Sequence, residues 1–401
     1  MKKPAAALPA VSAFVRRETV FSAAFLCACV SCFFVPPSKA YIAYIDWNTL
    51  CILFALMAVI AALRSCGVFS TLGGLLCRHV QSVRALSAVL VALCFFSSMF
   101  ITNDVALLTF VPFTLSLLIP VAGGGTVIYV VILQTIAANT GSMLTPLGNP
   151  QNLFLFQQTG LSVLPFCKIM LPYTAVSGVL LLLAVLFVPK TPLNASAHVR
   201  HIHANTEHAP NALGTTARFT LKMRIGTYSA LFVFCLLSVF RVIPKPAAAG
   251  AVCLVLLVID CAVLRRVDYM LLCTFGAFFV FTGNLSSLPA IHSALERAVL
   301  GHEFLAAVCS SQIISNVPAT LLLYPFTSIE RVQNLLIGVN AGGLGTLVAS
   351  LASLISYKLY ASSRTQQENL QHLPTGSRYL ALFTLCNVVW LCVLCALKSA
   401  H

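Results

Sequence analysis

Residues 97–112 read SSMFITNDVALLTFVP, and residues 310–325 read SSQIISNVPATLLLYP. Seven of the 16 aligned positions are identical, and Thr102 aligns with Ser315 as an eighth, conservative match. Each copy places a Thr/Ser-Asn pair in the middle of an apolar run. Polar side chains at membrane depth are costly unless they are paired or take part in function. The duplication therefore indicates two equivalent polar points inside a membrane protein.

The composition supports a membrane location for the whole chain. Of the 401 residues, 59% are hydrophobic and 8% are charged, and the mean hydropathy is +0.95. A soluble domain carries roughly 25% charged residues, so this chain is not a soluble enzyme. Its length allows about ten spans of roughly 20 residues each. The net charge of +14 does not indicate nucleic acid, because basic residues in such chains record orientation in the lipid bilayer.

Two long apolar runs, 85–119 and 302–327, carry the duplicated stretch near their centres. The first is too long for one straight span and the second is polar in the middle, so each predicts a helical hairpin that enters the membrane and turns back. Asn103 and Asn316 would lie at the two tips. The segments that precede the hairpins mix basic and apolar residues, which is typical of helices lying on the membrane surface.

Other matches extend the duplication. Residues 45–51 match 267–273, and residues 139–145 match 340–346 through the shared pattern N-x-G-x-x-x-T. The order in each half is span, surface helix, hairpin, broken span and last span. The sequence therefore predicts an all-α polytopic membrane protein of two inverted repeats, with about nine spanning helices, two re-entrant helical hairpins and two broken helices.

Domain boundaries and orientation follow from this order. The predicted units are an N-terminal extra span (1–40), the first repeat (41–190), a cytoplasmic polar linker (191–224), connecting spans (225–264) and the second repeat (265–401). With the N-terminus in the cytoplasm and the C-terminus outside, 17 of the 24 Lys and Arg residues lie on the inner side. This bias predicts a multi-pass protein of the cell membrane in that orientation.

The broken spans and the tips define the candidate site. Residues 139–151 contain two Gly and two Pro, and residues 340–346 contain three Gly, so neither makes a good continuous helix. Such backbone is tolerated at membrane depth only where it lines a cavity or is covered by protein. We expect four irregular elements to converge there. The candidate substrate- and ion-binding residues are Thr102, Asn103, Asp104, Asn139, Thr140, Gly141, Ser142, Thr145, Asn149, Ser315, Asn316, Val317, Asn340, Gly342, Gly343 and Thr346.

These elements suit ions of both signs. Helices that begin after Asn103 and Asn316 present free N–H groups and a positive dipole end to an anion. Carbonyl, amide and hydroxyl oxygens suit Na⁺, which we expect near Asn103, Asp104 and Gly141, with a second ion near Asn316 and Gly342. The alternative for both asparagines is that they only cap their helices.

Asp104 has Val317 as its counterpart and is the only acidic residue in either tip. It either complements the dipole of its helix or serves as a ligand of the coupling ion or as a proton carrier. Asp260 lies one turn before Arg265 and Arg266, which predicts an interfacial ion pair with them.

Four motifs carry a family resemblance: the Thr102-Asn103-Asp104 tip, residues 139–152, Ile314–Pro318 and Gly338–Gly345. They resemble the ion transporter superfamily, in which the divalent-anion/sodium symporters, citrate–metal transporters, arsenite efflux permeases and a sodium/proton antiporter family belong. The chain is most similar to the citrate-transporter-like permeases, from about residue 40 onward. In the symporters both tips read Ser-Asn-Thr and build paired Na⁺ and carboxylate sites. The resemblance also implies an elevator-type motion and often a homodimer.

The sequence predicts a secondary active transporter of a small anion, a carboxylate or an inorganic oxyanion, coupled to Na⁺ or H⁺. The alternatives are a cation/proton antiporter and an arsenite or antimonite efflux permease. No catalytic motif is present, so an enzyme is not expected, and no cofactor other than the coupling ion is expected.

Overall fold

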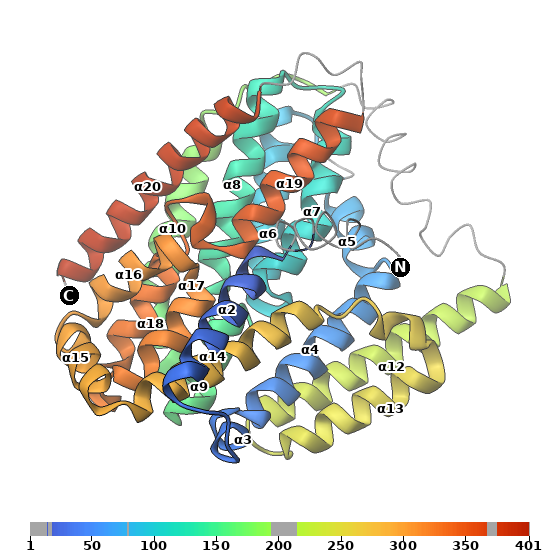
Figure 1. Cartoon of the computed structure of the whole chain (residues 1–401). Coiled ribbons are helices and arrows are strands. Elements are labelled where there is room, and N and C mark those ends of the chain that lie inside the picture. The colour runs from blue at the N-terminus through green and yellow to red at the C-terminus, as the bar shows by residue number, and fades with distance from the viewer. Residues whose placement is uncertain (1–13, 15–17, 78–79, 194–214, 367–374, 401) are drawn as a thin grey trace, which may run out of the picture.

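The computed structural model describes residues 14, 18–77, 80–193, 215–366 and 375–400 (Figure 1). These residues form α-helices with no β-strand. The helices are α2 (Thr19–Phe34), α3 (Ala40–Tyr44), α4 (Trp47–Ser65), α5 (Val68–Cys77), α6 (Val83–Ile101), α7 (Asn103–Leu118), α8 (Gly124–Ser142), α9 (Pro150–Thr159), α10 (Val163–Val185), α12 (Thr215–Val239), α13 (Lys245–Leu264), α14 (Tyr269–Ser287), α15 (Pro289–Val299), α16 (Glu303–Ile314), α17 (Asn316–Leu323), α18 (Val332–Ala341), α19 (Leu351–Gln366) and α20 (Gly376–Ala400).

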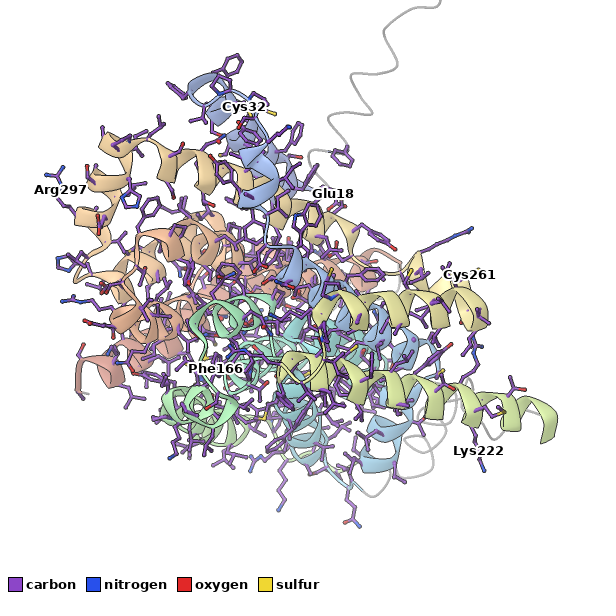
Figure 2. All side chains as sticks on the ribbon, turned by 90° about the horizontal axis from the view of Figure 1, so that it is seen from below. Glu18, Cys32, Phe166, Lys222, Cys261 and Arg297 are labelled. Carbon is purple, nitrogen blue, oxygen red and sulfur yellow. The ribbon has the colours of Figure 1, made fainter. Side chains whose placement is uncertain are left out.

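The described helices confirm an all-α polytopic membrane protein. Eight of them are long and apolar enough to cross a membrane: α4, α6, α8, α10, α12, α13, α14 and α20. The predicted count of about nine spans differs because the eight include α6, which is one arm of a hairpin. They leave out α2, a single helix of 16 residues, and the α18–α19 pair, which is two shorter helices. Phe166 lies among the packed helices, whereas Lys222 and Arg297 lie at the periphery (Figure 2).

Both predicted hairpins are present, and their tips share one backbone conformation. Thr102 joins α6 to α7 with φ 67° and ψ 147°, and Ser315 joins α16 to α17 with φ 74° and ψ 155°. Residues other than glycine rarely adopt a positive φ, and this backbone conformation costs on the order of 1–3 kcal/mol. The same unfavourable conformation at two aligned positions indicates that the surrounding packing imposes it in both halves.

The first spans of the two repeats run antiparallel. Near the start of α14, the Tyr269 ring lies 6.5 Å from that of Phe54 in α4. At the other end of α14, a Cβ added to Gly283 would lie 2.4 Å from the ring of Tyr44, which precedes α4. Equivalent helices of opposite direction are the arrangement that inverted repeats require.

The same side-chain cap starts both of these spans. Asp46 accepts a hydrogen bond from the Thr49 N–H at 3.1 Å, and Asp268 accepts one from the Leu271 N–H at 2.9 Å. These aspartates are aligned in the duplicated segments, so a carboxylate N-cap marks the beginning of each repeat.

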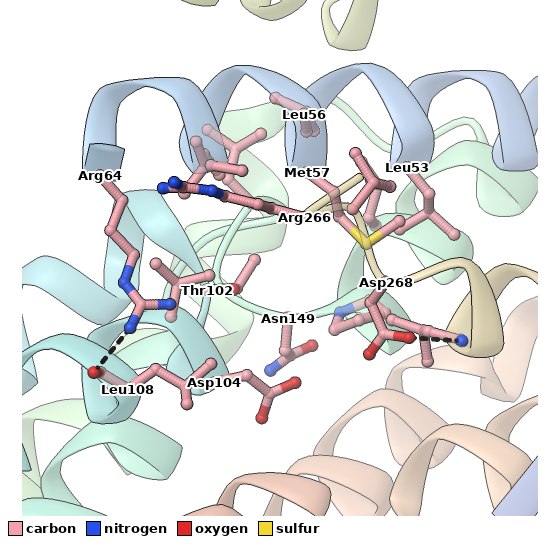
Figure 3. A pocket seen from close by; sticks show the side chains of 18 of the residues that line it. Leu53, Leu56, Met57, Arg64, Thr102, Asp104, Leu108, Asn149, Arg266 and Asp268 are labelled. Carbon is pink, nitrogen blue, oxygen red and sulfur yellow. Dashed lines mark hydrogen bonds between the residues drawn. The ribbon is translucent and has the colours of Figure 1, made fainter. Parts of the chain in front are cut away.

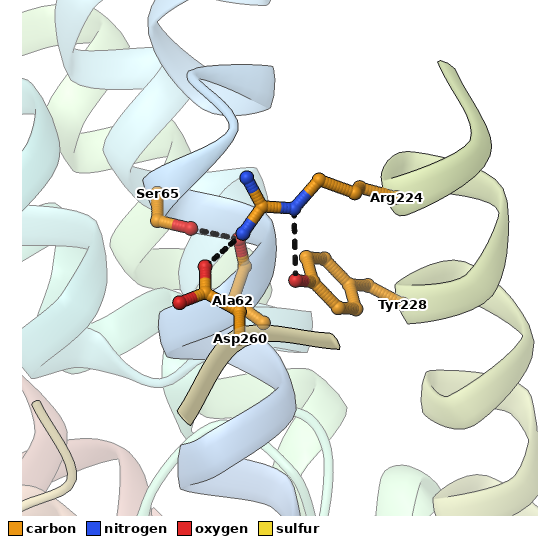
Figure 4. A network of polar contacts seen from close by, with 5 residues as sticks. All are labelled: Ala62, Ser65, Arg224, Tyr228 and Asp260. Carbon is orange, nitrogen blue, oxygen red and sulfur yellow. Dashed lines mark hydrogen bonds and ion pairs between the residues drawn. The ribbon is translucent and has the colours of Figure 1, made fainter. Parts of the chain in front are cut away.

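Helices α12 and α13 lie side by side and pack on α4, whereas α20 runs along the opposite edge near α10 (Figure 1). An ion pair joins α12 to α13: Arg224 donates to Asp260, and its Nε also lies 3.3 Å from the Tyr228 hydroxyl (Figure 4). The predicted partners of Asp260, Arg265 and Arg266, were therefore wrong. Helix α13 is interrupted at Asp260, which turns its carboxylate toward α12 instead of the helix end.

Most of the predicted linker lies outside the described residues, and α12 already begins at Thr215, inside the predicted linker range of 191–224. The unit boundaries remain predictions.

Candidate functional site

Asn139, near the end of α8, connects the first tip to the second repeat. Its Oδ1 accepts from Asn103 Nδ2 at 2.9 Å and from the Ser350 hydroxyl at 3.1 Å. Its Nδ2 donates to the Ser353 hydroxyl at 3.4 Å. Asn139 is buried, so these bonds satisfy an amide that would otherwise be costly in the membrane interior.

Asn340, its counterpart in α18, makes the same contacts in reverse. Its Oδ1 accepts from Asn149 Nδ2 at 3.1 Å, and its Nδ2 donates to Asn152 Oδ1 at 2.6 Å. Asn139 thus bonds the residues that lie ten and thirteen positions after Asn340, and Asn340 bonds those that lie ten and thirteen positions after Asn139. In both cases Oδ1 accepts from the nearer residue and Nδ2 donates to the farther one. Reciprocal contacts of this kind are what an approximate twofold axis between two halves produces. We call these four cross-repeat hydrogen bonds the amide cross.

Gly141 and Gly342, the glycines of the shared N-x-G-x-x-x-T pattern, allow the broken spans to approach the hairpins closely. A Cβ at Gly141 would lie 2.1 Å from the Phe95 carbonyl oxygen and 2.6 Å from the Ser98 hydroxyl. A Cβ at Gly342 would lie 2.8 Å from the Cβ of Ser311, the residue aligned with Ser98. In both halves, only glycine permits the broken span to pack directly on the first arm of its hairpin.

A second pair of contacts ties each break to its hairpin. Thr145 donates to the carbonyl of Met99, and Thr346 donates to the carbonyl of Gln312 at 3.1 Å, and both donors and both acceptors are aligned. The Gln312 amide also donates to the carbonyls of Gly342 and Leu344 at 2.8 and 2.9 Å. These side chains satisfy backbone carbonyls that the interrupted helix leaves without partners.

The first tip is tied to the break of α8 and α9. The Asn103 N–H donates to the Gly148 carbonyl at 3.0 Å, and the Asp104 N–H donates to Asn103 Oδ1 at 3.0 Å. Asp104 Oδ1 is buried and has no hydrogen-bond partner among the described residues. A buried carboxylate oxygen without a partner is expected where a cation or a proton binds.

The second tip is covered by protein. Ser315, Asn316 and Val317 are all buried, and the Ser315 hydroxyl lies 3.4 Å from the Ala349 carbonyl. A Cβ at Gly343 would lie 2.7 Å from Asn316 Nδ2, so this glycine makes room for the tip amide. The predicted convergence of tip and break therefore holds in this half as well.

A cavity of about 540 Å³ reaches the first tip (Figure 3). Of the candidate residues, Thr102, Asp104 and Asn149 line it. The facing wall comes from α4, the link between α13 and α14, and the start of α14, and it includes Arg64, Arg266 and Asp268. In Figure 3 the Asn149 amide lies between the carboxylates of Asp104 and Asp268.

A second cavity, of about 580 Å³, occupies the equivalent place in the other half. It is lined by Asp46, the counterpart of Asp268, and by Leu321, the counterpart of Leu108 in the first cavity. It ends six residues from Ser315 and does not include the second tip. Of these two cavities among the described residues, the first reaches its tip at Thr102 and Asp104 and the second does not reach the tip at Ser315.

The remaining candidates play supporting parts in the geometry. Thr140 donates to the Ile136 carbonyl of its own helix at 2.8 Å, so its hydroxyl does not face the tip. Ser142 donates to the Asn139 carbonyl at 2.8 Å and accepts from Asn149 at 3.2 Å.

Sequence reasoning missed several residues of this region. Asn152, Ser350 and Ser353 belong to the amide cross, and their equal spacing from the paired asparagines was a usable signal. Arg64 was assigned to a surface helix and to orientation, and Arg266 to orientation and to an ion pair with Asp260, but neither was assigned to the site. Among the described residues, no group of three or more His, Cys, Asp or Glu side chains could hold a metal ion.

Helical hairpins that meet two broken spans at a buried polar centre define a class of membrane transport protein. The profile of the citrate transporter family, CitMHS, matches residues 7–329, and the chain belongs to this family. The inner membrane protein YbiR of Escherichia coli K12 is 32% identical over 338 residues, which cover 82% of this chain and 84% of the relative.

Two further relatives are transporters by name. The uncharacterized transporter MJ0456 of Methanocaldococcus jannaschii is 30% identical over 323 residues, 79% of this chain and 81% of the relative. The silicon efflux transporter LSI3 of Oryza sativa subsp. japonica is 34% identical over 134 residues, 32% of this chain and 26% of the relative. The protein is therefore a multi-pass membrane transporter and not an enzyme.

Proposed function

We propose that the protein is a secondary active transporter of a small anion, a carboxylate or an inorganic oxyanion, coupled to Na⁺ or H⁺. The observation that carries the proposal is the cavity that ends on the first tip, where α7 begins. The Asn103 and Asp104 N–H groups donate to the Gly148 carbonyl and to Asn103 Oδ1, so the start of α7 offers an anion the positive end of the helix dipole. The family description and the name of the rice relative add support, since citrate and silicon transport are attributed to those proteins.

Asp104 supports the coupling part of the proposal. Its unpartnered Oδ1 lies beside the amides of the first tip and its carboxylate lines the same cavity. A carboxylate beside an anion site repels the anion unless a cation or a proton neutralises it, and this requirement is a physical basis for binding both ions together. Na⁺ ions near Asn103, Asp104 and Gly141, and near Asn316 and Gly342, remain part of this proposal.

Alternating access would move the hairpins and broken spans as one body. The amide cross joins α8 and α9 to α18 and α19, whereas α4, α12 and α13 pack mainly with one another. An elevator-type displacement of the first group against the second would close the first cavity at Thr102 and extend the second cavity to Ser315. A cytoplasmic N-terminus, an outer C-terminus and a homodimer complete the proposed arrangement.

Uptake into proteoliposomes tests this function. Purified protein is reconstituted and supplied with labelled citrate, succinate, phosphate, sulfate or arsenite under imposed Na⁺ or pH gradients. We expect gradient-driven uptake of at least one anion. The Asn103→Ala and Asn316→Ala variants each lose a buried amide that would hold the ion, and this loss is expected to cost roughly 1–3 kcal/mol, or about 5- to 150-fold in affinity. Uptake by a well-folded double variant that equals wild type would contradict a binding role for the tips.

The second candidate function is cation/proton antiport, which the unpartnered Asp104 oxygen favours. The same vesicles distinguish it, because an antiporter moves protons when Na⁺ is added with no transported anion present. A pH change inside vesicles that show no anion uptake would replace the anion proposal with this one. Uptake of arsenite alone would instead favour the efflux permease alternative.

A further inference from the structure

We propose that Arg64 and Arg266 form an anion-capturing subsite at the first cavity, on one face of the protein only. The inference rests on the proposed anion transport and specifies how the cargo is recognised before it reaches the tip. Both arginines line the cavity from the wall opposite Thr102 and Asp104, and Figure 3 shows both side chains at that wall. We call this pair the arginine subsite.

Arg64 is held in place by a carbonyl that a proline leaves free. Pro112 has no N–H, so the carbonyl of Leu108, four residues earlier in α7, cannot form its helical hydrogen bond. Arg64 Nη2 donates to this carbonyl oxygen at 2.9 Å. A guanidinium has five N–H donors in one plane, so most of them stay available to a carboxylate or another oxyanion. The anchor therefore orients Arg64 without using up its binding capacity.

Among the described residues, the two guanidiniums share the cavity with the carboxylates of Asp104 and Asp268 but form no ion pair with them. Neither guanidinium has a carboxylate oxygen of any described residue within 4.0 Å. The Asp268 carboxylate, on the same cavity, accepts from the N–H of Leu271 at the start of α14. Two cationic groups on one partly enclosed wall repel each other, and an anion between them removes this cost. A dicarboxylate or an inorganic oxyanion has the oxygens to accept from both.

The other half of the molecule has no such pair. When the two repeats are aligned on the caps Asp46 and Asp268, Arg64 aligns with Ser286 and Arg266 aligns with Tyr44. Ser286 and Tyr44 both line the second cavity. The repeat symmetry preserves the cavity but not the pair: among the described residues that line the second cavity, the one Lys or Arg is Lys245. The two faces of the transporter therefore differ in anion affinity, and the face with the first cavity captures the anion at lower concentration.

Ligand-induced stabilisation tests binding without transport. The melting temperature of the purified full-length protein is measured with increasing citrate, and separately with inorganic phosphate. Arg64→Ser and Arg266→Tyr each install the residue of the other half, and we expect the concentration giving the half-maximal shift to rise about tenfold or more for each. Arg265→Gln is the matched control, since Arg265 is adjacent and exposed but does not line the cavity. It should shift as wild type does.

Transport measured separately from each side of the membrane provides the second readout. In vesicles of defined orientation, KM for the same anion should rise about tenfold on the first-cavity face in either arginine variant and change less than about twofold on the other face. Ser286→Arg should lower KM on that other face. Wild-type anion shifts in Arg64→Ser and Arg266→Tyr, no shift in wild type with either anion, or equal changes with Arg265→Gln would overturn the subsite. Anion-induced shifts without any uptake would instead contradict the proposed transport function.

Discussion

Asp104 is the residue at which the two tips differ in charge, because Val317 takes its place in the second half. The two tips otherwise share their backbone, their asparagine and their contact with a glycine-containing break. A charge on one tip only gives the molecule one preferred place for a coupling cation or proton. The buried, unpartnered oxygen of this side chain is the structural sign of such a role.

Asp104→Asn keeps the shape of the side chain and removes its charge. We expect the half-saturating Na⁺ concentration for uptake to rise roughly tenfold, a change of about 1.4 kcal/mol, if the carboxylate binds Na⁺. If it carries a proton, the pH dependence of uptake should disappear. Asp268→Asn is the control, because asparagine also caps a helix and Asp268 lines the same cavity. If the Na⁺ and pH dependence of uptake are unchanged in Asp104→Asn, both coupling roles are excluded and the remaining role of Asp104 is to complement the dipole of α7.

Individual residues also mark where sequence reasoning reached its limit. The tips were predicted because a polar pair inside an apolar run is conspicuous. Arg64 and Arg266 were not, because a basic residue near a span end looks the same whether it sets orientation or lines a cavity. Asp260 was paired with its sequence neighbours, since nothing in the sequence showed that α13 is interrupted there and that α12 brings Arg224 alongside.

At the scale of the elements, each broken span packs on the first arm of its own hairpin through a glycine. The contact of α8 with α6 is the closer one, because the atom facing Gly141 is a backbone oxygen that cannot rotate away. Helix α18 also meets the backbone of α16, since a Cβ at Gly338 would lie 2.6 Å from the Phe304 carbonyl oxygen. The duplicated pattern predicted that Gly141 and Gly342 are equivalent but not how closely each approaches its hairpin.

Gly141→Ala should therefore destabilise the protein strongly, because the added methyl would lie 2.1 Å from the Phe95 oxygen and must separate α8 from α6. Overpacking of this kind costs typically 1–3 kcal/mol or more. Gly125→Ala in the same helix is the control, since no atom lies within 4 Å of its Cβ position. Thermal unfolding in detergent measures both variants. A Gly141→Ala protein as stable as Gly125→Ala would show that the two helices are not held at this distance.

At the scale of the whole molecule, the sequence predicted the class of fold and the existence of two equivalent halves, because the repeated motifs occur in the same order. It did not predict that, among the described residues, the first cavity reaches its tip and the second does not. That difference depends on how the helices are placed relative to one another in this conformation. The same sequence adopts every conformation of the transport cycle, so the sequence cannot indicate which cavity is open. The partners of Asn139 and Asn340 likewise depend on packing between segments about 200 residues apart.

Orientation is tested by labelling single cysteines on a background without the 16 native ones. Gln81 and His302 are exposed and precede the first and second hairpins. For inverted repeats in the proposed orientation, Gln81→Cys should react with an impermeant maleimide from the cytoplasmic side and His302→Cys from the outside. Labelling of both positions from the same side would contradict the inverted arrangement in the membrane.

The amide cross has a consequence for how the chain is made. Asn139, Asn149 and Asn152 leave the ribosome long before residues 340–353, which supply their partners. At roughly 5–20 residues per second, the first half waits about 10–40 s without the second-repeat partners of these buried amides. We therefore expect the first half on its own to be unstable in the bilayer. It would stay at the insertion machinery until the second half is made, or it would be degraded.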